Sequence, residues 1–248
     1  MKRVLGILAA AAAGGVFFGC SSEPLDANSG AAGSGGQAGH TLACSAALRQ
    51  KLSLVDETST AVVSILSESD GEQSLYVDAS GGGIAASEMQ PWVYLSLKTG
   101  MALGLTDIDA LKSTEWDLAF KRNLIRTNSG DSGPGDGGAL RVGLAWEKVT
   151  RATLGNKALP TESWFTGDQC EIPMDKLDSL GNVLTTYASW SEYDQATHVV
   201  SAAPDTVFIT AGGDGTVYKV QIEDYYSTPS GAHGTIAGRY KLRAAPLP

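Results

Sequence analysis

The residues best suited to chemistry lie in a glycine-rich segment, in which G-D-S-G-P-G surrounds Ser132. A serine in such a turn becomes a nucleophile when a histidine base, oriented by an aspartate, lies beside it. Backbone N–H groups must also stabilise the oxyanion, and Pro134 has no N–H to contribute. The histidines do not support this mechanism: His40 lies among small residues without apolar neighbours, and His198 and His233 follow Ser132. The pattern therefore argues against a serine protease, and we expect no enzymatic activity.

Two carboxylates in the same segment, Asp131 and Asp136, raise the alternative of a cation site. Oxygen-rich, flexible loops suit calcium. The spacing of these residues does not match an EF-hand, however, and Asp-Gly pairs are typical of tight turns. A structural turn is therefore the favoured interpretation of this segment, with calcium binding as the alternative.

The start of the chain has the pattern of a lipoprotein signal peptide. Two basic residues precede an apolar run over residues 4–18, and Gly19 precedes Cys20. The run is shorter than the ~20 residues that a membrane-spanning helix needs, and an uncleaved membrane anchor is the alternative. We expect residues 1–19 to be removed and the Cys20 thiol to be acylated, for example with palmitate, which anchors the protein in a bilayer. Ser21 after the cysteine favours the bacterial outer membrane.

Small and polar residues fill the next segment, residues 20–41, and predict a flexible tether. Beyond the tether the only cysteines are Cys44 and Cys170. Two cysteines in an exported protein favour a disulfide, which would clamp the segment after the tether to the body. The alternative is two unpaired cysteines that lie far apart in the fold.

The chain is acidic, with a formal net charge of −9 at pH 7. Removal of residues 1–19 takes away two basic residues and no acidic one, so the mature protein is more acidic still. An acidic surface argues against nucleic acid as a partner and against attraction to anionic lipid headgroups.

The elements that would position a site are mostly strands. Residues 42–72 carry apolar residues near helical spacing and predict an N-terminal helical extension, although the β-branched run after Thr58 fits either a helix or a strand. A β domain is expected over residues 73–244, with a hairpin turn at the Gly-Gly-Asp-Gly run of residues 212–215 and a short helix over residues 174–191. The expected strands are 74–79, 92–97, 116–126, 139–146, 206–211, 216–222 and 235–242. We therefore expect a mainly β fold of two opposed antiparallel sheets with two helical segments.

Two blocks of sequence resemble a known family. The first is W-D-L-A-F, a basic residue, and then R-T-N-S-G-D-S-G with its glycine-rich continuation, over residues 116–139. The second is T-V-F-I-T-A-G-G-D-G-T-V-Y-K-V-Q-I-E-D-Y-Y at residues 206–226, followed by G-T-I-A-G-R-Y-K-L at residues 234–242. This order resembles the HmuY family of exported bacterial lipoproteins, some of which bind haem. The resemblance spans residues 74–243 and is weakest between residues 142 and 203.

The resemblance implies that an apolar cleft in the β body captures haem without chemistry. The cargo would pass to an outer-membrane receptor of the TonB-dependent kind, and a haem-carrying protein is a further implied partner. In haem-binding relatives, histidine or methionine ligands to the iron come from the stretch before the closing hairpin. That stretch here offers His198 and Met174, with Tyr193 and Cys170 as weaker donors. A His/Met pair would give a low-spin haem with a raised potential.

A surface-exposed binding module without haem is the alternative function on the same fold. Trp146, Trp164, Trp190 and Tyr193 could then form an aromatic contact patch for a protein or a carbohydrate. Trp164 and Trp190 fall among polar residues in the divergent middle of the chain, where a specialised site would lie. We expect Trp190 and Tyr193 to contact the ligand.

Overall fold

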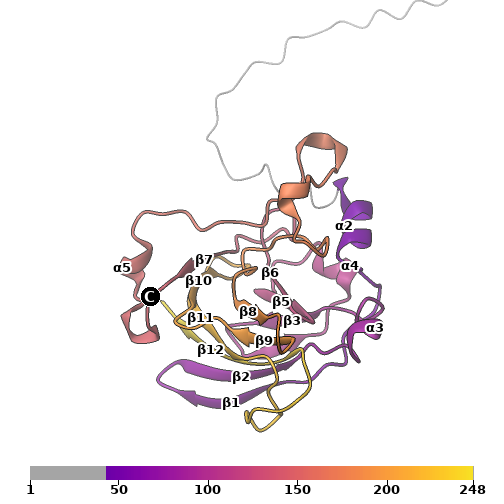
Figure 1. The fold of residues 1–248 in the computed structure, drawn as a ribbon. Coiled ribbons are helices and arrows are strands. Elements are labelled where there is room, and N and C mark those ends of the chain that lie inside the picture. Colours follow the sequence, from indigo (N-terminus) through magenta and orange to yellow (C-terminus); the bar gives the residue numbers. More distant parts are fainter. Residues whose placement is uncertain (1–42, 248) are drawn as a thin grey trace, which may run out of the picture. The chain divides into compact units, whose positions relative to one another are not determined.

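The computed structural model describes residues 43–247 (Figure 1). The expected signal peptide, the lipidation site Cys20 and the tether lie outside this part of the chain. Within it, no helix combines the length and the apolarity that a membrane crossing requires.

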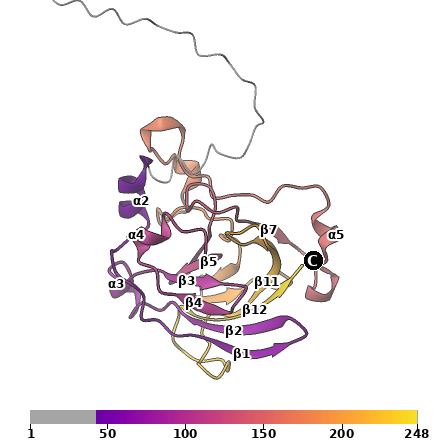
Figure 2. The ribbon, with the colours of Figure 1, turned by 180° about the vertical axis from the view of Figure 1, so that it is seen from behind.

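Two antiparallel sheets face each other across an apolar core (Figures 1 and 2). The larger sheet has the spatial order β1 (Val63–Ser69), β2 (Glu72–Asp78), β12 (Arg239–Pro246), β11 (Val217–Asp224), β10 (Val207–Ala211) and β7 (Gly138–Val142). The smaller sheet has the order β4 (Met101–Leu103), β3 (Val93–Ser96), β5 (Leu118–Lys121) and β6 (Leu124–Thr127). A separate hairpin consists of β8 (Ser191–Asp194) and β9 (Val199–Ala202). The expected mainly β fold with two opposed sheets is confirmed.

Helices are few and short in the described part of the chain. They are α2 (Ser45–Lys51), α3 (Ile84–Ser87), α4 (Asp107–Ala110) and α5 (Arg151–Leu154), with 3-10 turns η1 (Trp146–Lys148), η2 (Gly167–Gln169) and η3 (Met174–Lys176). In both ribbon views α2 and α4 lie on the same side of the body, and Leu48 and Ala110 bring them into one buried apolar cluster (Figures 1 and 2).

The core between the sheets follows from the period-two pattern of the strands. Leu75 and Val77 of β2 and Leu118 and Phe120 of β5 are fully buried in one apolar cluster. Each such side chain contributes about 1.5–3 kcal/mol when it leaves water. The alternating apolar residues thus hold the two sheets together.

The two sequence blocks of the family resemblance meet in space through Asp117. Its carboxylate accepts hydrogen bonds from the N–H of Leu97 at 2.6 Å and from the N–H of Gly213 at 2.9 Å. Burial raises the pKa of the Asp117 carboxyl, and these N–H donors oppose that rise. A Cβ on Gly213 would overlap Thr114 O, so only glycine allows the β10–β11 turn to approach the smaller sheet this closely.

The N-terminal helical extension expected over residues 42–72 is helical only at its start. Helix α2 ends at Lys51, and β1 pairs with β2 through a turn in which Asp70 and Gly71 have φ angles of 52° and 78°. This is the geometry of a tight hairpin, which Asp-Gly favours. The β-branched residues before the turn suit the strand. The domain boundary expected at residues 72–73 falls inside this hairpin.

The short helix expected over residues 174–191 is wrong beyond its first turn. The 3-10 turn η3 ends at Lys176. The Asp178 carboxylate then accepts hydrogen bonds from the N–H of Leu180 and from the N–H of Asn182, both at 2.8 Å. Such side-chain bonds to nearby backbone compete with helix formation, so the segment folds as turns.

Three expected strands have clearly different limits. The run over residues 139–146 is a strand only as far as Val142, and Trp146 begins the 3-10 turn η1. The run over residues 116–126 folds as the β5–β6 hairpin, because Arg122 has a φ of 51° and turns the chain. The final strand begins at Arg239 instead of residue 235, because Gly238 has a φ of 86°, outside the strand region.

Candidate functional site

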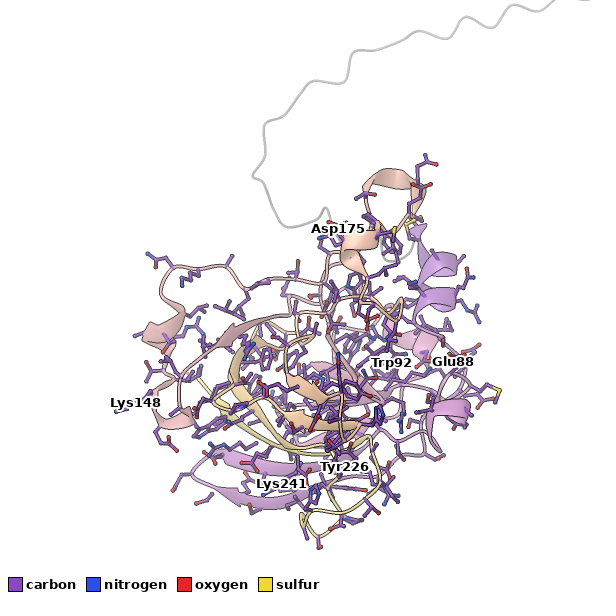
Figure 3. The ribbon with its side chains drawn as sticks, viewed as in Figure 1. Glu88, Trp92, Lys148, Asp175, Tyr226 and Lys241 are labelled. Carbon is purple, nitrogen blue, oxygen red and sulfur yellow. A yellow bond between two sulfur atoms is a disulfide. The ribbon has the colours of Figure 1, made fainter. Side chains whose placement is uncertain are left out.

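A cavity of about 620 Å³ opens between the end of α2, helix α3, the β5–β6 turn and the β8–β9 hairpin. This volume falls in the range of about 300–1,000 Å³ that is typical of small-molecule sites. Leucine, isoleucine, valine and tyrosine side chains form much of its wall, with charged groups among them. Figure 3 labels two residues of the wall, Glu88 and Tyr226, which come from segments far apart in the sequence.

Three turns around the cavity hold a non-glycine residue in the left-handed region of backbone space. These residues are Ser53, Arg122 and His198, with φ angles of 48°, 51° and 58°. Among the residues that the structure describes, the only others of this kind are Asp70, Cys170 and Asp205. Residues with a side chain adopt this conformation at an energetic cost, and such strain concentrates at functional sites. The strained backbone positions therefore lie around the same cavity that has the volume of a small-molecule site.

The cavity wall is cationic although the chain as a whole is acidic. Lys51, Lys121 and Arg122 line it, and Glu88 is the single carboxylate that does so among the described residues. The full chain carries a net charge of −9. A local charge opposite to the net charge attracts and holds anions, so the wall favours an anionic ligand.

Lys121 is the most buried of the cations, with 8% of its surface exposed. Its Nζ donates to Ser53 O at 2.7 Å and lies 3.5 Å from Glu88 O. Burial lowers the pKa of the Lys121 ammonium to about 8, and the nearby carboxylate of Asp107 opposes that shift. These contacts place a partly desolvated cation between the end of α2 and the end of α3.

The β8–β9 hairpin presents Tyr193 and His198 together at the cavity, as exposed residues. The turn closes with the His198 N–H donating to Asp194 O at 2.8 Å. The Asp194 carboxylate accepts a hydrogen bond from the Ala196 N–H at 2.8 Å, which lowers the pKa of the Asp194 carboxyl. The Tyr193 hydroxyl lies 2.6 Å from His198 Nδ1. This hydrogen bond orients the imidazole, and in the tautomer that carries its proton on Nδ1 the other nitrogen, Nε2, can bind a metal.

Two tyrosines form the wall beneath the hairpin. Tyr225 and Tyr226 both line the cavity, and the Val200 N–H donates to the Tyr226 hydroxyl at 3.2 Å. Trp190 packs on Tyr225 with their ring centroids 5.3 Å apart. Trp190 itself is 3% exposed and does not line the cavity. Trp190 thus lies one ring behind the wall of this cavity, and its contact with a ligand stays a prediction.

Met174 is not near the cavity wall. It is 89% exposed in η3 and is absent from the lining of the cavity. Figure 3 shows its neighbour Asp175 well separated from Tyr226. The structure thus does not bring together His198 and Met174, the two iron ligands expected from the sequence.

A disulfide joins Cys44 to Cys170 across a sequence separation of 126 residues. It holds the start of α2 against η2, and Lys51 and Leu52 at the other end of α2 line the cavity. The disulfide therefore helps to position one wall of the cavity. It also removes the Cys170 sulfur from the possible metal ligands.

The glycine-rich segment packs closely against neighbouring backbone. A Cβ on Gly130 would overlap Glu162 O, and Ser132 is buried with its Oγ accepting a hydrogen bond from Arg126 at 2.7 Å. The Asp131 carboxylate accepts a hydrogen bond from the Phe165 N–H at 2.9 Å. Between residues 43 and 247 no group of three or more His, Cys, Asp or Glu side chains could hold a metal ion. These contacts favour a structural turn over a nucleophile or a calcium site.

Sequence reasoning missed the cationic side of the cavity. Lys51 lies in the predicted helical extension, and Lys121 and Arg122 lie in a run that the sequence pattern predicts as one continuous strand. A signal was present, since Asn123 between two apolar runs is a residue typical of turns.

The family model described as HmuY protein matches residues 88–240, a range that holds the first sequence block and all but the last two residues of the second. A solved structure from Bacteroides vulgatus ATCC 8482, classed as an HmuY-like haem-binding protein, is 17% identical with a TM-score of 0.43, over 76% of this chain and 97% of that chain. The apo HmuY analogue of Tannerella forsythia is 14% identical with a TM-score of 0.39, over 78% of this chain and 100% of that chain. The comparison with curated proteins gives no significant match. Because the family model covers more than half of the sequence, this protein belongs to the HmuY family.

Proposed function

We propose that this protein captures haem in the 620 Å³ cavity and passes it, without chemistry, to an outer-membrane uptake system. The observation that supports the proposal most strongly is that His198 lines the cavity with its imidazole hydrogen-bonded to Tyr193. A neutral histidine that donates its Nδ1–H to a neighbour presents Nε2 to a metal, and metal-binding histidines commonly use this arrangement.

The residues of the wall fit haem in their chemistry. His198 Nε2 would bind the iron, and Tyr225 and Tyr226 would contact the macrocycle. Bound haem would supply an iron that takes axial ligands, while the protein supplies binding and orientation. Among the described residues of the wall there is no second histidine and no methionine. We therefore expect one histidine ligand in place of the His/Met pair.

Absorption titration with haemin tests the proposal on the mature chain without its acyl groups. We expect a Soret shift at micromolar haemin, and we expect His198→Ala to weaken binding by about tenfold or more and to change the band. His233→Ala is the matched control, because His233 is an exposed histidine that bonds to Asp224 and does not line the cavity. Absence of a band, or an equal effect of both variants, would contradict the assignment.

The lipid anchor is part of the same proposal. Acylation of Cys20, which the signal-peptide pattern predicts, would hold the folded body at the outer membrane on a tether. Labelling of cells with an alkyne analogue of palmitate is expected to mark the protein and to fail for Cys20→Ser. Label that persists in Cys20→Ser would show that the anchor lies elsewhere.

A second candidate function is the docking of a protein on the rim of the cavity. Ile84 and Leu180 line the cavity and are 81% and 82% exposed, and apolar side chains of this kind favour contact with a protein. Trp146 and Trp164, expected in an aromatic contact patch, are buried. A receptor or a haem-carrying protein would use this rim. The double variant Ile84→Ser/Leu180→Ser should slow haem transfer from methaemoglobin while haemin affinity stays unchanged; an unchanged rate would remove the candidate.

A further inference from the structure

We propose that Lys51, Lys121 and Arg122 bind the carboxylates of the ligand, so that the cavity selects a porphyrin by its acidic edge. This inference rests on the proposed function and adds specificity to it, since it assigns recognition to the organic part of the ligand as well as to the iron. Its starting point is a wall that carries three cations and one lining carboxylate in a chain with a net charge of −9.

These cations form no ion pair within the described part of the chain, since the ion pairs there do not involve Lys51, Lys121 or Arg122. The carboxylates of Asp107 and Glu88 act on Lys121 without an ion-pair contact, and its Nζ donates to Ser53 O at 2.7 Å and to Glu88 O at 3.5 Å. Arg122 donates one N–H to Ala237 O at 3.3 Å. An ammonium group has three N–H donors and a guanidinium group has five. Both cations therefore keep donors for a ligand.

The main-chain contacts also fix where the two charges lie. Lys121 is held towards the end of α2, whereas Arg122 is held towards the segment that precedes β12. Charges that are in place before a ligand arrives reduce the ordering cost of binding. A carboxylate that meets them forms charge-assisted hydrogen bonds, and with Arg122 the pair can be bidentate.

Iron and carboxylates would thus be recognised by different elements. His198 belongs to the β8–β9 hairpin, whereas the three cations belong to the end of α2, the end of β5 and the β5–β6 turn. Separate recognition predicts that the two contributions can be removed independently. A ligand without iron should still respond to changes in the cations, and a ligand without carboxylates should still respond to changes in His198.

Three probes separate these contributions in a binding titration: haemin, haemin dimethyl ester and iron-free protoporphyrin IX. Neutralising the carboxylates as esters is expected to weaken binding by about tenfold or more, because hydrogen bonds between charged groups are lost. Protoporphyrin IX keeps its carboxylates but lacks the iron, so its binding should depend on the cations and not on His198.

The variants Arg122→Gln and Lys121→Gln should weaken haemin and protoporphyrin IX by about tenfold and leave haemin dimethyl ester unchanged. Lys112→Gln is the matched control, an exposed lysine outside the cavity wall. Circular dichroism checks that the variants are folded. If the variant at the buried Lys121 unfolds, the binding of Arg122→Gln alone decides the test. Equal binding of haemin and its ester would overturn this inference and leave the proposed function standing. Failure of all three probes to bind would overturn both this inference and the proposed function.

Discussion

Replacing Cys44 and Cys170 together by alanine is expected to lower the free energy of unfolding by up to about 5 kcal/mol. The disulfide closes a loop with a sequence separation of 126 residues. In the chain-entropy description, a cross-link that closes a loop of this length restricts the unfolded chain by about 4.9 kcal/mol. Alanine is the better substitute because Cys44 is buried among apolar residues, where a serine hydroxyl would lack a solvent partner.

Guanidinium denaturation, followed by circular dichroism, measures this loss as a lower midpoint with an unchanged or larger slope. Wild-type protein unfolded with dithiothreitol is the control and should match the double variant. The variant should also bind haemin more weakly, because α2 carries Lys51 and Leu52 of the cavity wall. Equal midpoints for the variant and the oxidised wild type would refute the reasoning, as would free thiols in the unfolded, unreduced wild type.

Three further predictions concern single residues. The folded protein lowers the pKa of Lys121 from about 10.5 to about 8, so at this residue the unfolded chain binds more protons in this window, and the contribution of Lys121 to the free energy of unfolding should rise with pH from 8 to 10. The difference in free energy of unfolding between wild type and Lys121→Met, measured by urea denaturation, should therefore change with pH, and parallel pH profiles would contradict this. Gly130→Ala should cost about 2–4 kcal/mol, since its φ is 52° and its Cβ would overlap Glu162 O, whereas Gly143→Ala, with open space around it, should be nearly neutral; equal melting temperatures would contradict this. Haemin bound in the cavity should quench the fluorescence of Trp190, which packs on the wall residue Tyr225, and a Trp190→Phe variant with undiminished quenching would contradict this.

The strands of the two sheets could be predicted because each strand shows its own alternation of apolar residues. Alternating buried residues such as Leu118 and Phe120, and turn residues at 212–215, are local features that a single segment displays. The predicted helices were wrong where a side chain bonded to nearby backbone N–H groups or where a tight turn ended the helical spacing of the apolar residues. Asp178 bonds to nearby N–H groups, and the turn at Asp70 and Gly71 draws β1 into the larger sheet.

The cavity could be predicted only in part, because its wall joins segments that are distant in the sequence. His198 and Tyr193 were found, since both lie in the one stretch where the family resemblance placed ligands. Lys121 and Arg122 were missed, because their role depends on a turn whose other side is built by α2 and by residues beyond Tyr225. No local pattern in the sequence shows that these segments meet.

A crystal structure of the protein with bound haemin tests most directly whether this cavity is the haem site. We predict the porphyrin between the β8–β9 hairpin and the β5–β6 turn, with iron bound to His198 Nε2 and carboxylates towards Lys121 and Arg122. Haemin bound at another surface, or iron held by side chains that do not line this cavity, would contradict the assignment.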